Sequence, residues 1–376
     1  MLDAPGPWGT GPFNLTQGYS SIQNIQAIIN KDPFSSTWIT QQEERTPLVV
    51  LEANRQYWDP SRGPKVSRVV FKNDLSKEDA LRLCMTTEGQ VDIVTQVKPE
   101  NAKKVRTSEY AKLVHVDGNK VFVGLFNRFK RDVDFSDDNL RLAFNLAIER
   151  ETIIQKGFYG YAKSVPALTP QWAVDFPEGL TARGCHANRA RNLLKSSGWR
   201  QGRKLKVATT IEFQHIATII ASQIQDTLQI GVEVTIYNYH DNLKLRRMLA
   251  EKKFVPTWDI LLIRSSALFL EGTPAFFHRE FFGSDGALRV GPKNEEFDQL
   301  FNKMVAQTDQ SKLISVAKEI DRYAFKESLG LFICSPQDLY AVNRHVNFLP
   351  YRTTFELADT NVTDSHWSRG FQEGNK

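Results

Sequence analysis

The segment Asn139–Ile154, NLRLAFNLAIERETII, decides the fold of this chain. Its apolar residues recur near helical spacing, and the acidic and amide residues at 137–139 are candidate N-caps. Gly157 follows as a stop signal, so the pattern predicts one amphipathic helix. An apolar strand, VFVGLFN at 121–127, precedes the helix, and a turn running into Pro166 follows it. These flanks make the segment more specific than an amphipathic helix alone.

Five further motifs occur in a fixed order around this segment. They are PWGTGPF at 7–13, LEANRQYW at 51–58, GPKV at 63–66 before VVF at 69–71, AL at 80–81 leading to GQVDI at 89–93, and NRARNLLKSSGW at 188–199. Together with the central segment, they resemble the signature of the family 5 extracellular solute-binding proteins. The members of that family are the oligopeptide-, dipeptide- and nickel-binding receptors of ABC importers. The resemblance continues more weakly to about residue 345.

The resemblance implies an α/β fold of the two-lobed periplasmic-binding-protein type (type II), with a ligand cleft between the lobes. It places residues 1–122 and 336–376 in the first lobe and residues 123–335 in the second. The residues themselves favour an α/β second lobe, because strand and helix patterns alternate along it. This βαβαβ rhythm predicts a parallel sheet covered by helices. Strands are expected at 205–211, 231–237 and 258–263, and helices at 217–228 and 241–252.

The composition bounds the class of protein. The chain has 376 residues, of which 41% are hydrophobic, and this length is enough for two globular domains. The net charge of +5 is dispersed, so the basic patches indicate a solvated face and no nucleic-acid partner. No run of about 18 apolar residues exists, and no membrane insertion is expected. The three cysteines, Cys84, Cys185 and Cys334, lie far apart without metal-ligand spacing, and their odd number argues against a complete disulfide framework.

Enzyme signatures are mostly absent from the sequence. It contains no G-x-S-x-G elbow, no H-E-x-x-H helix and no Walker lysine loop, and its seven histidines are scattered. The carboxylate pairs at 137–138 and 295–296 lie at expected helix starts, where stabilisation of the helix dipole explains them. We therefore assign no catalytic residue, no metal ligand and no cofactor, and we expect a non-catalytic binding protein.

The best candidate for a binding site is the segment that follows the strand expected at 258–263. Arg264 can pair there with a carboxylate or phosphate through two hydrogen bonds. Ser265 and Ser266 can donate hydrogen bonds, and Phe269 can form an apolar wall. Strand ends in α/β sheets open onto the crevice where ligands bind. The alternative interpretation is an exposed arginine followed by an ordinary loop.

Two further residues are weaker candidates for ligand contact. Asn127 ends the strand that crosses toward the second lobe. Trp172 lies in the loop after Pro170, which the resemblance places near the cleft. The alternative role for Trp172 is a hydrophobic plug of the second lobe.

The resemblance also bears on the class of ligand. Peptide receptors of the family carry a Gly-Trp pair beyond the aspartate of the strand, and then an aspartate that holds the α-ammonium group of the peptide. Counted from Asp259 without gaps, the Gly-Trp positions fall on Arg264 and Ser265, and the aspartate position falls on Leu268. Leucine cannot offset a buried ammonium group. We therefore expect a small anionic or neutral ligand, or a modified peptide.

The start of the chain raises further expectations. Family members carry a substantial segment before the Gly-Thr-Gly-Pro turn, which begins here at Gly9. A missing N-terminal segment would leave a sheet edge open, so self-association or a second chain that completes the first lobe is expected. The resemblance implies an ABC permease as partner and a periplasmic or extracellular location. If Met1 is the true start, the alternative is a cytoplasmic enzyme or regulator that reuses the fold.

Overall fold

The computed structural model describes residues 9–18, 20–21, 44–129, 132–238, 241, 257–266, 275–286, 289, 291–352 and 355–369. The chain forms two compact units. Unit 1 comprises Met1–Val116 and Asp338–Lys376, and unit 2 comprises Asp117–Gln337. The chain therefore passes between the units twice, and the second passage lies within one long strand, β13 (Gly330–Asn343).

Unit 2 is built on a mixed sheet in the strand order β11-β10-β12-β8-β13, with β9 also paired to β13. The other strands are β8 (Lys120–Phe126), β9 (Ala162–Ser164), β10 (Leu205–Thr210), β11 (Val232–Tyr237) and β12 (Ile260–Ser266). Strand β10 runs parallel to β11 and β12, whereas β8 runs antiparallel to both of its neighbours, β12 and β13. The parallel arrangement predicted for the strands at 205–211, 231–237 and 258–263 is therefore confirmed, and β8 and β13 add antiparallel pairs to the sheet. The chain enters the sheet through β8 at the end where β12 finishes, so these two strands must run in opposite directions.

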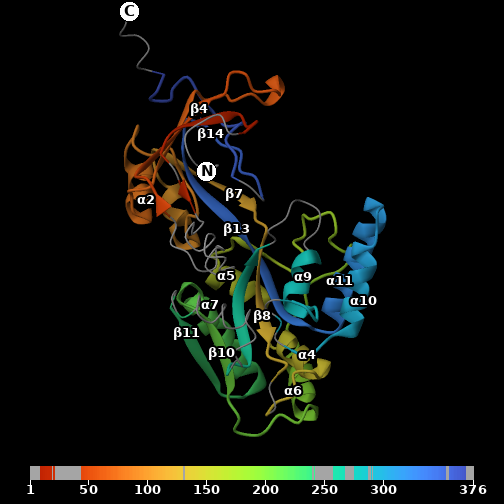
Figure 1. Ribbon diagram of the computed structural model, residues 1–376. Coiled ribbons are helices and arrows are strands. Elements are labelled where there is room, and N and C mark those ends of the chain that lie inside the picture. Colours follow the sequence, from red (N-terminus) through yellow and green to blue (C-terminus); the bar gives the residue numbers. More distant parts are fainter. Residues whose placement is uncertain are drawn as a thin grey trace, which may run out of the picture. The chain divides into compact units, whose positions relative to one another are not determined.

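The helices of unit 2 cover both faces of this sheet (Figure 1). Within the described part of unit 2 these helices are α4 (Asp138–Leu146), α5 (Arg150–Gly157), α6 (Ala187–Ser196), α7 (Gln214–Leu228), α9 (Ala275–Phe282), α10 (Glu295–Val305) and α11 (Gln310–Lys326). A short 3-10 helix, η3 (Ile211–Phe213), links β10 to α7. The helix expected at 241–252 lies almost wholly outside the described residues.

The single helix predicted over Asn139–Ile154 is two helices, so this part of the prediction is wrong. Helix α4 ends at Leu146, and α5 restarts after Glu149, whose side chain accepts a hydrogen bond from the Glu151 amide. The Asp137 side chain caps α4 as expected, and α5 ends at Gly157, also as expected. The break escaped prediction because apolar residues on both of its sides are buried in one cluster.

Strand β8 connects two hydrophobic clusters because alternate residues of a strand point to opposite faces. Phe122 and Phe126 lie in a cluster with side chains of α4, α5, α6 and α7. Val121, Val123 and Leu125 lie in a second cluster with side chains of α9, α10 and α11. Gly124 interrupts the series because neighbouring strands approach closely there. A Cβ atom at Gly124 would lie 2.9 Å from Ile260 Cγ2 and 3.0 Å from Leu331 Cβ.

Unit 1 contains a three-stranded antiparallel sheet in the order β1-β4-β5, formed by β1 (Phe13–Gln17), β4 (Leu48–Ala53) and β5 (Arg68–Lys72). The described residues of unit 1 also form the helices α2 (Lys77–Thr86) and α3 (Ala102–Arg106) and the 3-10 turns η1 (Pro60–Arg62) and η2 (Pro99–Asn101). Its remaining strands are β2 (Ser20–Ser21), β3 (Glu44–Arg45), β6 (Ile93–Val94), β7 (Ala111–Asp117), β14 (Val346–Asn347) and β15 (Asn361–Val362). The second half of β13 pairs with β6 in this unit.

A polar cluster ties η1 to the C-terminal segment of unit 1. Arg62 donates a hydrogen bond to Glu356 at 3.1 Å and another to Asp359 at 3.4 Å. The Tyr351 hydroxyl also donates to Asp359. That hydrogen bond lowers the pKa of the Asp359 carboxyl. Burial opposes this effect, and the charge of Arg62 adds to it, so the pKa is lowered overall.

Candidate functional site

The candidate site lies at one end of the unit 2 sheet, which we call the carboxyl end. The parallel strands β10, β11 and β12 finish there, at Thr210, Tyr237 and Ser266. Ser266 pairs with Lys120, the first residue of β8, so the antiparallel strand begins at this same end. The chain also enters unit 2 at Asp117 and leaves it at Gln337 near this point. Ligand sites of α/β sheets lie beyond the carboxyl ends of their strands.

The carboxylate of Asp117 joins the two segments by which the chain enters and leaves unit 2. Lys163 Nζ donates to Asp117 Oδ2 at 2.6 Å, and Gln337 Nε2 donates to Asp117 Oδ1 at 2.8 Å. The Ser335 hydroxyl donates to the Lys120 carbonyl at 2.7 Å. These contacts fix the spacing of the two crossing segments at the carboxyl end.

Arg264 lies within β12 and not in the loop after it, because the strand continues to Ser266. The sequence-based end of this strand, at Ile263, is therefore wrong, and pairing of Arg264 with Phe122 of β8 explains the extension. Arg264 Nη1 forms an ion pair of 3.1 Å with Glu212, and its guanidinium lies over the Phe213 ring at 5.5 Å. The Arg264 side chain is 39% exposed and that of Glu212 is 54% exposed. This ion pair is accessible to an incoming molecule.

The other predicted residues near Arg264 differ in their surroundings. Ser265 is buried and pairs with Val121, and successive strand residues point to opposite faces of a sheet. Ser266 is the last residue of β12, and Phe269 lies outside the described residues. Trp172 is half-buried, and its Nε1 atom donates to the carbonyl of Gly118 at 3.0 Å, which places it at the same end. The structure thus brings Arg264, Ser265, Ser266 and Trp172 to one end of the sheet.

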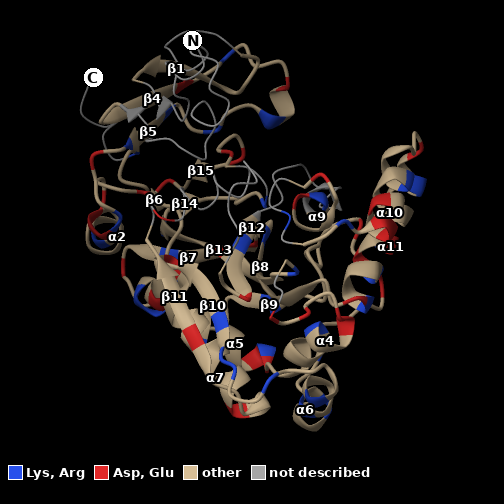
Figure 2. Cartoon of the chain, turned by 60° about the horizontal axis from the view of Figure 1, so that its bottom comes forward, with Lys and Arg blue, Asp and Glu red and all other residues tan. Residues whose placement is uncertain are grey.

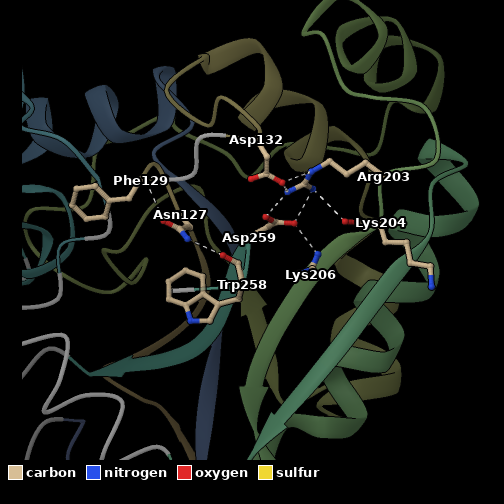
Figure 3. A network of polar contacts seen from close by, with 8 residues as sticks. All are labelled: Asn127, Phe129, Asp132, Arg203, Lys204, Lys206, Trp258 and Asp259. Atoms are coloured by element: carbon tan, nitrogen blue, oxygen red, sulfur yellow. Dashed lines mark hydrogen bonds and ion pairs between the residues drawn. The ribbon is translucent and has the colours of Figure 1, made fainter. Parts of the chain in front are cut away.

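Asn127 lies at the opposite end of the sheet. It follows β8, and six residue steps of a strand, about 20 Å, separate the two ends. Its Nδ2 atom donates to the Trp258 carbonyl at 2.8 Å, and its Oδ1 atom accepts from the Phe129 amide at 3.1 Å (Figure 3). Asn127 is completely buried, and its side chain orders the turn after β8. The structure therefore does not bring Asn127 together with Arg264.

Sequence reasoning missed the network that surrounds Asp259 at this opposite end (Figure 3). Arg203 donates to both oxygens of Asp259, at 2.8 and 2.9 Å, and to Asp132 Oδ2 at 3.0 Å. The Lys206 amide also donates to Asp259, at 2.8 Å. Burial lowers the pKa of Arg203, but the two carboxylates outweigh burial, so the pKa is raised overall. The only signal in the sequence was the basic patch around Arg203. Its partners Asp259 and Asp132 lie 56 and 71 residues away in the chain, so the sequence did not connect them with Arg203.

Other features of the described residues lie apart from the carboxyl end. An open hollow of about 410 Å³ lies against residues 186–189 at the start of α6, and none of the predicted site residues lines it. No three His, Cys, Asp or Glu side chains of the described residues are grouped as a metal site would require. None of the helices described is long and apolar enough to cross a membrane. Acidic and basic residues are mixed along α10 and α11 (Figure 2), where Lys303 pairs with Glu319 at 2.7 Å.

Comparison with solved structures identifies the fold. The ABC transporter substrate-binding protein CtaP from Listeria monocytogenes is 17% identical, with a TM-score of 0.75 over 94% of this chain and 67% of that one. The nickel ABC transporter protein from Bacillus halodurans is 17% identical, with a TM-score of 0.70 over 94% of this chain and 69% of that one. DppA from Helicobacter pylori, solved with the peptide STSA, is 16% identical, with a TM-score of 0.67 over 90% of this chain and 67% of that one. The chain thus has the type II fold of periplasmic binding proteins and spans about two thirds of the length of these structures.

Sequence comparison identifies the family. No curated protein matches the chain. The family model described as bacterial extracellular solute-binding proteins, family 5 middle, matches residues 4–267, which is more than half of the chain. This span includes β8, both helices α4 and α5, and all of β12. The chain belongs to the family 5 bacterial extracellular solute-binding proteins.

Proposed function

We propose that the protein is the solute-binding receptor of an ABC-type importer and captures a small anionic or neutral ligand, or a modified peptide, between two lobes. The lobes we propose are residues 1–122 with 336–376, and residues 123–335. Membership of the family supports the receptor role. The observation that supports the ligand class is the exposed guanidinium of Arg264 near the carboxyl end of β12.

The ion pair of Arg264 with Glu212 is weak enough to be exchanged for a ligand. Both side chains are more than one third exposed, and such surface pairs contribute about 0–1 kcal/mol to stability. A ligand carboxylate can replace Glu212 and form two parallel hydrogen bonds with the planar guanidinium. The Phe213 ring under the guanidinium keeps Arg264 oriented toward the end of β10. A neutral ligand would instead accept hydrogen bonds from Arg264 while Glu212 remains paired.

Ligand binding in this proposal shifts an equilibrium between open and closed arrangements of the lobes. Only a difference in affinity for the two states can drive such a shift. The two chain crossings next to Asp117 and Gln337 are the segments about which closure would occur. The closed form would then dock on an ABC permease in the periplasm or at the cell surface, where members of the family act.

The test is a binding titration with a panel of small carboxylates and with one tripeptide in free and N-acetylated forms, followed by small-angle scattering. We expect an acidic or N-acetylated compound to bind and to reduce the radius of gyration. Arg264→Gln should lower the affinity for an anionic ligand at least tenfold, because one charge-assisted hydrogen bond contributes about 1.5–3 kcal/mol. Arg200→Gln is the matched control, since Arg200 is an exposed arginine elsewhere on unit 2.

Three results would contradict the proposal. Preference for the free tripeptide over its acetylated form would refute the ligand class. Equal binding by the Arg264 and Arg200 variants would exclude the role of Arg264. Absence of binding and compaction across the panel would remove the support for the receptor role.

A further inference from the structure

Buried arginines in unit 2 satisfy their guanidinium groups with main-chain carbonyls. Arg141 donates to the carbonyls of Phe135 and Ser136, at 2.7 and 2.8 Å, and to further carbonyls at the end of α11. Arg150 donates to the carbonyls of Phe332 and Arg183, at 2.8 and 2.6 Å. Each of these cations therefore has several oxygen acceptors around it, as a buried guanidinium requires.

Arg128, in the turn after β8, departs from this pattern. Its Nη2 atom is inaccessible to solvent and has no hydrogen-bond acceptor among the described residues. The main chain packs directly against the guanidinium, since a Cβ atom at Gly291 would lie 2.5 Å from Arg128 Nε and 2.8 Å from its Cζ. Figure 3 shows the neighbouring residues Asn127 and Phe129 of this turn. Arg128 is thus held in a fixed place while one of its donors has no acceptor there.

Neighbouring charges make this position more positive. Burial and the nearby charges of Arg141 and Arg289 together lower the pKa of Arg128 to about 10, against an opposing contribution from Tyr323. Arg128 therefore remains protonated at neutral pH and keeps its charge. Arg289 is also held close by, because its guanidinium lies over the Phe129 ring at 6.0 Å and donates to the Ser284 carbonyl. A buried cation without an opposite charge is costly to the fold.

We propose that Arg128 and Arg289 bind a tetrahedral oxyanion, sulfate or phosphate, on unit 2. The planar fork of Arg128 can donate two hydrogen bonds to such an ion, and Arg289 supplies a second positive charge for a dianion. Gly291 brings the main chain close to the guanidinium, because a Cβ atom at this position would lie 2.5 Å from Arg128 Nε. The site lies at the end of β8 where Asn127 lies, about 20 Å from Arg264 along the strand, and is independent of the function proposed above.

The experiment measures thermal unfolding and isothermal titration of the whole chain in sodium sulfate and sodium phosphate, with sodium chloride at matched ionic strength. We expect either oxyanion to raise the unfolding temperature more than chloride does. Arg128→Gln should lower the affinity for sulfate at least tenfold and should not destabilise the protein in sulfate-free buffer, because it removes an uncompensated charge. Arg322→Gln is the control, since Arg322 is exposed on α11 beside Tyr323.

A second variant keeps the test decisive if Arg128→Gln does not fold. Arg289→Gln should lower the affinity for sulfate at least threefold and should leave the circular dichroism spectrum of the folded protein unchanged. The proposal is overturned if sulfate and phosphate stabilise no more than chloride does. It is also overturned if the Arg128 or Arg289 variant binds sulfate as tightly as the Arg322 variant.

Discussion

Replacing Asp259 by asparagine tests whether the network around it stabilises the end of the unit 2 sheet that lies opposite the carboxyl end. The carboxylate is completely buried and accepts two hydrogen bonds from Arg203 and one from the Lys206 amide. Asparagine keeps the size of the side chain, but it removes the negative charge and turns one acceptor into a donor. Its NH2 group would then face either the guanidinium or the Lys206 amide, and both of those are donors.

The expected loss of unfolding free energy follows from the burial of Asp259 and Arg203. Removing one partner of a buried ion pair costs about 3–5 kcal/mol, and Arg203, which is 11% exposed, retains its contact with Asp132. We therefore expect Asp259→Asn to lower the free energy of unfolding by about 3 kcal/mol. For a unit of this size, each kcal/mol shifts the melting temperature by about 2–4 °C, so the expected decrease is about 6–12 °C.

Urea unfolding followed by tryptophan fluorescence measures this effect, because the Trp199 ring lies 4.6 Å from the Arg203 guanidinium. The matched control is Asp132→Asn, which removes a carboxylate that is 50% exposed and should cost about 0.5 kcal/mol. The reasoning is refuted if Asp259→Asn costs less than about 1 kcal/mol or if the two variants are equally destabilised.

Three further predictions concern other parts of the chain. Gly124→Ala should destabilise unit 2 by about 1–3 kcal/mol in urea unfolding because its Cβ would overlap two neighbouring strands, whereas Gly184→Ala, with its nearest contact at 3.8 Å, should stay within about 0.5 kcal/mol. Iodoacetamide at pH 8 should modify Cys185 first, because Cys185 is half-buried whereas the other two thiols are completely buried. Burial raises the pKa of all three thiols, so accessibility decides the order, and mass spectrometry of the peptides identifies the modified thiol. The lowered pKa of Asp359 stabilises unit 1 fully above pH ~5, and this stabilisation is lost as the pH falls through 3.8 toward the folded pKa, so Asp359→Asn should flatten the acid limb of a stability–pH curve measured by thermal unfolding. An unchanged acid limb would contradict that assignment.

Local signals in the sequence were sufficient for much of the fold. Residues 205–237 alternate between strand and helix patterns, and the structure has β10, α7 and β11 there. The N-cap at Asp137 and the stop at Gly157 were also predicted correctly, because capping depends on hydrogen bonds within one turn. These are properties of neighbouring residues, and a single sequence displays them directly.

Properties that depend on distant partners were not accessible in the same way. The extension of β12 to Ser266 follows from pairing with β8, which lies well over 100 residues earlier in the chain. The position of Asn127 depended on the direction of β8, and an apolar strand has the same pattern in either direction. For this reason the sequence grouped Asn127 with Arg264, although the antiparallel strands carry them to opposite ends. Arg203 likewise reveals its role only when the fold brings Asp259 to it.

Strand β13 contains a β-bulge with one extra residue. This residue determines to which face of the sheet each later side chain of β13 points. Phe332 pairs with Val123 and Cys334 pairs with Phe122, so Ile333 is inserted between two successive pairs. Ile333 and Cys334 consequently both contribute to the same hydrophobic cluster. Deletion of one residue at this bulge would invert the in-and-out phase of the strand from there to Asn343, including the half that pairs in unit 1. One inserted residue in unit 2 thus determines which side chains the far end of the strand presents to the core of unit 1.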